Sequence, residues 1–420
     1  MFRKKLGFLL VGVLTASLGV GHGDLASLNY NFKEKQIKKY SSKEWKVNKL
    51  EKVKYPVDYN MRKWKDFQTH NEMIDACNVP ESILDKMSTD EVIDLVMDYP
   101  LLCDIYAYDT LNQGLEALCE QNLAFEELFS REDGASMLLE YYKKFEISEN
   151  TAIPAELLEE DFDEIIDEVS EKEELNEMIL EDSEELTNEV TLETLLAQEE
   201  VLNNLSDMEK EELNKEAIKK LEEKSQSDLY KGLESVFYDT IQECSNEDKI
   251  GNYKLCKKTD NTDDFVYGCA DYYVKTPKGT KVKVEKYTFF GDATAISITN
   301  QYRNAYPKAT LLLPATNVFN CHSYAWYSQS QTMSSGYWMN NPEAYVSDKS
   351  YKLVGNSPTA NNQKVAYHKI PHKVGFQHSG IVVSYSTRTI KSKWGQAPLM
   401  KHKVDYSPYT NCNILYYKKS

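Results

Sequence analysis

Hydrophobic residues recur at helical spacing through residues 66–146, which predicts a small N-terminal helical bundle. Residues 88–91 form a capping-box pattern, in which a hydroxyl and a Glu carboxylate each satisfy a free backbone amide. The apolar positions of residues 92–97 follow at helical spacing, and Pro100 ends that helix. We find no combination of side chains in this bundle that would carry catalysis.

Leucine and isoleucine continue through residues 155–225 without a strict heptad. This segment holds 27 Asp and Glu against 6 Lys, a balance of −21, so solvated helices are expected. We therefore predict an acidic helical linker over residues 147–244. Two interpretations of it stay open: a solvated spacer, or a surface that docks on the C-terminal region of the same chain.

Strand-like runs replace the helical pattern from residue 245 onward. Residues 274–276 and 280–287, separated by Pro-Lys-Gly at 277–279, predict a hairpin. Residues 381–383 and 389–390 predict two more strands. Helices followed by strands favour the α+β class, with one α+β domain over residues 245–420.

The N-terminus resembles a secretory signal. Arg3, Lys4 and Lys5 precede an apolar run over residues 6–20, and small residues follow up to Gly23. We predict a signal peptide over residues 1–23 and a secreted, extracellular protein that associates with the cell wall. The alternative is an uncleaved N-terminal anchor. Residues 24–65 lack a clear period and are interpreted as a polar tether, and no stable membrane span is expected after signal cleavage.

Composition and charge narrow the classes of partner. The chain has 420 residues, of which 41% are hydrophobic and 28% charged, which excludes a collagenous chain and a small disulfide-rich fold. The net charge is −18, but residues 245–420 hold 23 Lys and Arg against 11 Asp and Glu, a balance of +12. This basic region is expected to attract an anionic wall polymer or the acidic segment rather than nucleic acid, because arginine is nearly absent from it.

Eight cysteines are present, and Cys256 and Cys269 flank a turn across which they could form a disulfide. No Cys-x-x-Cys and no His pair stands at ligand spacing. We therefore predict no metal and no cofactor.

The run from Asn320 to Tyr327, Asn-Cys-His-Ser-Tyr-Ala-Trp-Tyr, carries the chemistry. It follows a loop and reads as a helix start at Cys321, where backbone amides and the helix dipole favour a thiolate. His378 opens the strand-like run His-Ser-Gly-Ile-Val-Val and is the candidate general base. His322 follows the thiol directly, but on a helix it is expected to point elsewhere and to be structural.

These two motifs resemble those of the papain-like NlpC/P60 and CHAP superfamily, whose helix begins with (D/N)C-x-G/S-Y/F and whose base lies in H-x-G/A-I/V. The resemblance spans residues 290–415 and implies a papain-like α+β domain that cleaves amide bonds in cell-wall peptides. It makes Cys321 the nucleophile and His378 the base, then the acid. The helical bundle is similar to a module of secreted proteins from Gram-positive bacteria, which implies no activity.

The resemblance also implies a third residue that accepts a hydrogen bond from the imidazole. The strand after the base offers lysines, which cannot accept one, so Ser392 is our candidate, with Gln396 or a backbone carbonyl as alternatives. Together these observations predict a secreted Cys–His amide hydrolase acting on cell-wall peptide. Two rivals stay open: an inactive extracellular binding module on this fold, and a transferase or effector that reuses the thiol.

Overall fold

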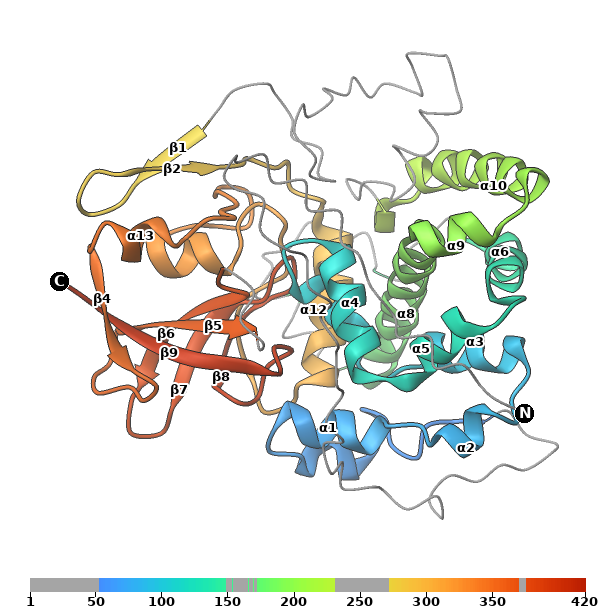
Figure 1. The fold of residues 1–420 in the computed structure, drawn as a ribbon, viewed down its shortest axis with the longest axis horizontal. Helices are drawn as coiled ribbons and strands as arrows, with labels where there is room; N and C mark the ends of the chain where they lie inside the picture. Colours follow the sequence, from blue (N-terminus) through green and yellow to red (C-terminus); the bar gives the residue numbers. More distant parts are fainter. Residues whose placement is uncertain are drawn as a thin grey trace, which may run out of the picture.

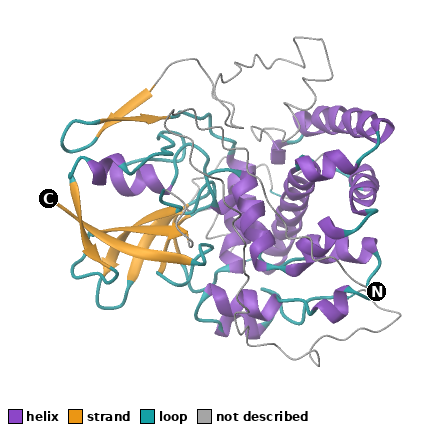
Figure 2. Ribbon diagram, in the orientation of Figure 1, coloured by secondary structure: helices purple, strands orange, loops and turns teal. Residues whose placement is uncertain are grey.

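The computed structural model describes residues 53–148, 153, 165, 169, 172–230, 272–369 and 375–420. A strand-rich part and a helical part lie side by side, with the long helix α12 between them (Figure 1). Figure 2 shows the same division by secondary structure, with the strands gathered on one side. The chain is therefore an α+β protein, as its sequence pattern predicts.

Helices account for most of the described residues before residue 231. The α-helices are α1 His70–Cys77, α2 Glu81–Leu84, α3 Thr89–Met97, α4 Leu111–Gln121, α5 Leu123–Ser130, α6 Gly134–Lys144, α8 Glu173–Leu196, α9 Glu199–Asn204, α10 Asp207–Gln226, α12 Asp292–Ala305 and α13 Ala344–Ser347. The shorter turns are η1 Arg62–Asp66, η2 Leu102–Ala107, η4 Asp228–Tyr230 and the π-helical η5 Ser323–Tyr327.

The strands form a hairpin and one larger antiparallel sheet. They are β1 Tyr272–Lys275, β2 Lys281–Val284, β3 Thr310–Leu313, β4 Tyr351–Gly355, β5 Lys364–Lys369, β6 His378–Ser384, β7 Thr389–Lys393, β8 Leu399–Lys403 and β9 Cys412–Lys419. The seven-stranded sheet has the order β3-β8-β7-β6-β5-β9-β4, and β1 pairs with β2 in a separate two-stranded sheet. The predicted hairpin and the two predicted strands that became β6 and β7 are confirmed.

Local capping explains where several helices begin. Ser88 accepts from Glu91 N while the Glu91 carboxylate accepts from Ser88 N, so the predicted capping box at α3 is confirmed. Ser206 and Glu209 form a second capping box at α10. The hydroxyl of Thr110, which follows η2, accepts from Gln113 N and so caps the start of α4.

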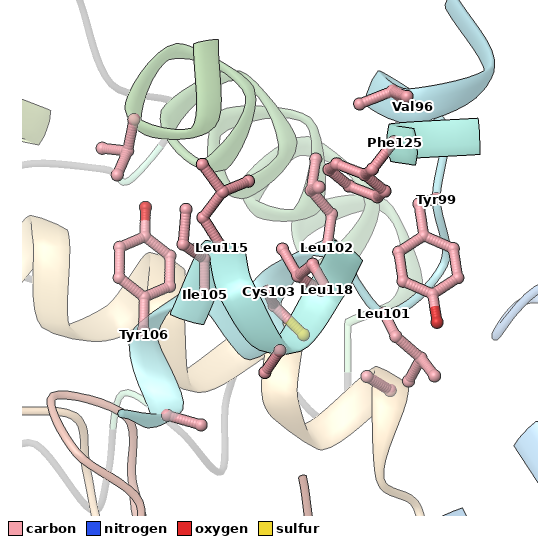
Figure 3. Close-up of a cluster of buried hydrophobic side chains, with 14 of the residues drawn as sticks. Val96, Tyr99, Leu101, Leu102, Cys103, Ile105, Tyr106, Leu115, Leu118 and Phe125 are labelled. Atoms are coloured by element: carbon pink, nitrogen blue, oxygen red, sulfur yellow. The ribbon is translucent and has the colours of Figure 1, made fainter. Parts of the chain in front are cut away.

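One hydrophobic core joins the helical part to the sheet. The turn η2 belongs to it, and Figure 3 shows its side chains Leu102, Cys103, Ile105 and Tyr106 beside Leu115 and other apolar groups. From α12, the hydroxyl of Tyr302 donates to the carbonyl oxygen of Cys103 at 2.7 Å. The helical bundle and the C-terminal domain are thus one packed body rather than two parts joined by a linker.

Residues 53–65, the part of the predicted tether that the structure describes, pack against the rest of the protein. Val53, Tyr55, Val57 and Trp64 are buried in the core. The indole nitrogen of Trp64 donates to the carbonyl oxygen of Ala305 at 2.8 Å. The prediction of a tether is therefore wrong for residues 53–65: the Tyr55 hydroxyl donates to the Leu95 carbonyl oxygen of α3, and Trp64 lies against the end of α12.

The acidic segment also differs from a wholly solvated spacer. Helix α8 packs on α12, and Ser183 Oγ donates to the carbonyl oxygen of Ser297 at 2.8 Å. Thr187 Oγ1 donates to Gln301 Oε1 at 2.7 Å. Hydrogen bonds from hydroxyl groups therefore connect the two helices. The second half of α8 is buried although the segment is acidic overall.

The predicted signal peptide and the proposed Cys256–Cys269 pair lie outside the described residues. Five cysteines within the described ranges are free thiols: Cys77, Cys103, Cys119, Cys321 and Cys412. Where the structure describes the chain, no helix combines the length and apolar character needed to cross a membrane.

Candidate functional site

Asn320 anchors the start of the helical turn that carries Cys321. Its side-chain oxygen accepts from Ser323 N at 3.1 Å and from Met339 N at 3.2 Å. Its amide nitrogen donates to the Met339 carbonyl oxygen and to Asp109 Oδ1, both at 2.9 Å. Asn320 is fully buried, and these four bonds use its whole hydrogen-bonding capacity. The turn therefore has a rigid N-cap that also binds the helical part of the chain.

Three side chains converge at this turn. The Cys321 sulfur, a ring nitrogen of His322 and a carboxylate oxygen of Asp109 all lie within 4.8 Å of one another. Cys321 is 2% exposed and His322 is buried, whereas Asp109 keeps 17% of its side chain exposed. Asp109 is therefore the edge of the cluster that faces solvent.

The imidazole of His322 is hydrogen-bonded at Nδ1 and faces a carboxylate at Nε2. Its Nδ1 lies 2.9 Å from Ser379 Oγ, which also accepts from the indole nitrogen of Trp326 at 2.8 Å. Its Nε2 lies 3.6 Å from Asp109 Oδ2, too far for a hydrogen bond. Burial disfavours the imidazolium, but Cys321 and Asp109 outweigh that effect and raise the pKa of His322 well above 6.5.

His322 is thus the imidazole that the structure brings to the thiol, and the expectation that it points elsewhere is wrong. Neighbouring residues on a helix diverge by about 100°, but an imidazole is long enough to reach back toward a preceding side chain. Asp109 was not expected either. It follows η2 in the helical part, and its own segment carries no motif that would indicate a role here.

His378 lies at the start of β6, on the face of the strand opposite to Ser379. It pairs with Tyr367 of one core cluster, whereas Ser379 pairs with Ala366 of the other. Its ring stacks on Tyr409 with centroids 3.6 Å apart, and neither ring nitrogen has a hydrogen-bond partner among the described residues. Burial, with His402 and His322 nearby, lowers the pKa of His378 well below 6.5.

Ser392 belongs to a different buried pair. Its hydroxyl lies 2.8 Å from His402 Nε2, and His402 Nδ1 donates to the carbonyl oxygen of Lys403 at 2.8 Å. This arrangement places the proton on Nδ1, so Ser392 donates to Nε2 while accepting from the Trp394 indole at 3.0 Å. Burial lowers the pKa of His402 to about 4, in keeping with a neutral ring. The hydrogen bonds described for Ser392 thus join it to His402 and Trp394 rather than to His378.

Lys393 links the loop before Cys321 to the turn between β7 and β8. Its buried ammonium donates to the carbonyl oxygens of Thr316 at 2.9 Å, Gly395 at 2.7 Å and Ala397 at 2.5 Å. Burial lowers the pKa of Lys393 well below 10.5, although Cys321 opposes that shift. The lysine thus holds the loop before Cys321 against the turn between β7 and β8.

A segment of the helical part covers this region of the C-terminal domain. Gln396 N donates to the carbonyl oxygen of Tyr106 at 2.9 Å, and the Tyr108 hydroxyl donates to the carbonyl oxygen of Pro408 at 3.0 Å. The hydroxyl of Tyr409 donates to the carbonyl oxygen of Ala107. These contacts bring Asp109 to the thiol.

The cluster can act chemically in two ways: as a thiol with an acid–base partner, or as a set of sulfur, nitrogen and oxygen donors. No protein-family model matches the chain, and neither the curated proteins nor the solved structures contain a match to it.

Proposed function

We propose that this protein is a secreted cysteine amide hydrolase that acts on cell-wall peptide, with Cys321 as its nucleophile. The observation that supports this most directly is the convergence of Cys321, His322 and Asp109 within 4.8 Å. A thiol, an imidazole and a carboxylate are the groups that nucleophilic amide hydrolysis uses. The substrate class and the papain-like fold rest on the resemblance of the two motifs to NlpC/P60 and CHAP enzymes.

In this proposal the Cys321 thiolate attacks the amide carbonyl, and a C–S bond forms as the carbonyl π electrons move to oxygen. His322 as imidazolium then gives its proton to the leaving amine while the C–N bond breaks. Water, deprotonated by the neutral imidazole, attacks the acyl carbon; the C–S bond breaks, the acid is released, and the thiolate and the imidazolium are restored. Asp109 stabilises the imidazolium through charge, and Ser379 fixes the ring at Nδ1.

The motif resemblance instead gives the imidazole role to His378, and variants separate the two assignments. Iodoacetamide labelling of the full chain at pH 7, measured by mass spectrometry, reports the reactivity of each thiol. Cys412 serves as the internal reference, because burial raises its pKa to about 12. We expect Cys321 to label faster than Cys412, and His322→Gln to slow that labelling by at least about tenfold.

His378→Gln, the matched variant, should change labelling little if His322 carries the proton. Loss of labelling in His378→Gln alone would assign the base to His378 instead. Product analysis on purified cell-wall fragments then tests hydrolysis, and release of no new amine by the wild type would contradict the proposed activity.

The second candidate is an extracellular binding module on the same scaffold. It is favoured by the burial of Cys321, whose 2% exposure leaves a substrate little access to sulfur. In that case Cys321 and Cys412 would label at similar slow rates, while the basic C-terminal region would still retain anionic wall polymer in a salt-dependent manner.

A further inference from the structure

We propose that Asp109, Cys321 and His322 form a binding site for a thiophilic divalent cation of the zinc type. Thiolate sulfur, imidazole nitrogen and carboxylate oxygen are the three ligand types that proteins offer to Zn²⁺. Three protein ligands with a fourth position left for water or substrate are typical of open zinc sites. This site goes beyond the proposed hydrolase and does not depend on its activity.

The orientation of the three side chains supports the proposal. Asn320 occupies Asp109 Oδ1, so Oδ2 is the oxygen that faces His322. Ser379 occupies His322 Nδ1, so Nε2 is the nitrogen that faces Asp109. That Nε2 is buried and has no hydrogen-bond partner among the described residues. Outer partners that fix one atom of a ligand and direct the other at the ion are a general feature of metal sites.

The spacing fits a tetrahedral ion. With Zn–N and Zn–O bonds of about 2.0–2.1 Å, two ligand atoms of one tetrahedral ion lie about 3.3 Å apart. Asp109 Oδ2 and His322 Nε2 are 3.6 Å apart, too long for a hydrogen bond but within a few tenths of an ångström of that value. The sulfur lies within 4.8 Å of an Asp109 carboxylate oxygen and of a His322 ring nitrogen, so small side-chain rotations would complete the coordination.

Sequence spacing cannot indicate such a site, because Asp109 comes from a segment more than 200 positions before Cys321 and His322. Cys321 and His322 are adjacent, which is not a recognised zinc spacing, and the prediction of no metal rested on the lack of a Cys-x-x-Cys and of a His pair at ligand spacing. The third ligand is supplied by tertiary packing, through the bond between Asn320 and Asp109.

The test uses the full chain, reduced and freed of metal with a chelator. Titration with Co²⁺ should give a near-ultraviolet band from thiolate-to-cobalt charge transfer, together with the visible bands of tetrahedral cobalt. Zn²⁺ should abolish both signals. Cys321→Ser should remove the charge-transfer band, whereas the control Cys412→Ser should retain it.

Zn²⁺ affinity, measured by competition with a chromophoric chelator, tests the other ligands. Asp109→Asn and His322→Gln should each weaken it by at least about tenfold, and the positioning variant Ser379→Ala by about 10- to 100-fold. Saturating Zn²⁺ should also protect Cys321, but not Cys412, from iodoacetamide.

Absence of the charge-transfer band in the wild type would overturn the proposal. So would a wild-type Zn²⁺ affinity that survives unchanged in both Asp109→Asn and His322→Gln. The two proposals fail separately: fast metal-free labelling without cobalt binding contradicts only the metal site, and cobalt binding without amide cleavage contradicts only the hydrolase.

Discussion

The side-chain amide of Asn320 donates a hydrogen bond of 2.9 Å to Asp109 Oδ1, across 211 positions of sequence. This bond joins the N-cap of the thiol-bearing turn to the segment that follows η2. The helical part therefore contributes a charged side chain to the candidate site as well as a share of the core. A C-terminal fragment beginning near residue 245 would keep Cys321 and His322 but lose Asp109.

Replacement of Asn320 by alanine tests this junction. Asn320→Ala leaves the Met339 amide and carbonyl, Ser323 N and Asp109 without the partner they now share. Buried polar groups that lose their partners cost about 1–3 kcal/mol each, and an N-cap is worth about 1 kcal/mol, so we expect a loss of about 3 kcal/mol or more. Urea denaturation measures it.

The exposed Asn60 provides the control, and Asn60→Ala should change the free energy of unfolding by no more than about 0.5 kcal/mol. Equal stabilities for the two variants would show that the Asn320 network contributes nothing to folding.

Sequence reasoning could find the parts of the site that are local. The turn at Cys321 and the strand beginning at His378 follow from short motifs, and both elements are present. Asp109 could not be found in this way, because its position depends on the fold of two distant segments. The strand register places His378 and Ser379 on opposite faces of β6, so it is Ser379 that contacts His322, which the motif alone does not indicate.

The same division holds for the fold. The capping box at Ser88 and the turn at Gly279 are short-range signals, and the structure has both. The burial of Trp64 and of the second half of α8 depends on α12, far along the chain, and periodicity cannot report it. The net charge of the acidic segment predicted solvated helices, but hydroxyl groups on α8 form hydrogen bonds with α12.

Gly395 should tolerate no side chain. Its φ is +53°, and an added Cβ would lie 2.5 Å from the carbonyl oxygens of both Tyr106 and Tyr108. The left-handed conformation alone costs about 1 kcal/mol, and the clash should add about 1–3 kcal/mol in Gly395→Ala.

Gly279 is the matched control for backbone strain, because its φ is +91° and its added Cβ would meet nothing within 4 Å. Thermal unfolding of Gly395→Ala and Gly279→Ala compares the two positions. A larger loss of stability in Gly279→Ala than in Gly395→Ala would mean that the segment containing Tyr106 and Tyr108 can move to accommodate the added Cβ.

Ser392→Ala distinguishes a structural hydroxyl from a catalytic one. The variant removes the hydrogen bond to His402 Nε2, although the Trp394 indole, 3.2 Å from that nitrogen, can replace it in part. We expect the free energy of unfolding to fall by about 1–3 kcal/mol, with no change in the iodoacetamide rate of Cys321. The exposed Ser330 gives the control variant Ser330→Ala. A tenfold slower reaction of Cys321 in Ser392→Ala alone would restore Ser392 as a positioning residue.

A buried charge cluster lies away from the thiol, between α8 and α10. The Lys224 ammonium is 2.7 Å from Glu193 Oε1 and 3.0 Å from Glu189 Oε1, and the Tyr142 hydroxyl donates to Glu193 at 3.0 Å. Lys220, also buried, attracts Glu189 from the same helix as Lys224. Burial dominates over this attraction and, with repulsion from Glu193, raises the pKa of Glu189 to about 7.

The stability of the protein should therefore fall as the pH rises from about 4.5 to about 7. In this window folded Glu189 retains a proton that the unfolded chain has released, since the ordinary pKa of a glutamate, as in the unfolded chain, is 4.5. Each pKa unit corresponds to 1.36 kcal/mol, so the contribution is on the order of 3 kcal/mol. Glu189→Gln keeps the shape without the charge, so its advantage over the wild type should grow through this window and level off above pH 7. Urea denaturation at pH 5, 6.5 and 8 measures the difference, with Glu211→Gln as control at a carboxylate that is 70% exposed. Parallel pH profiles for the wild type and Glu189→Gln would mean that Glu189 is ionised throughout, with its two lysine neighbours outweighing burial.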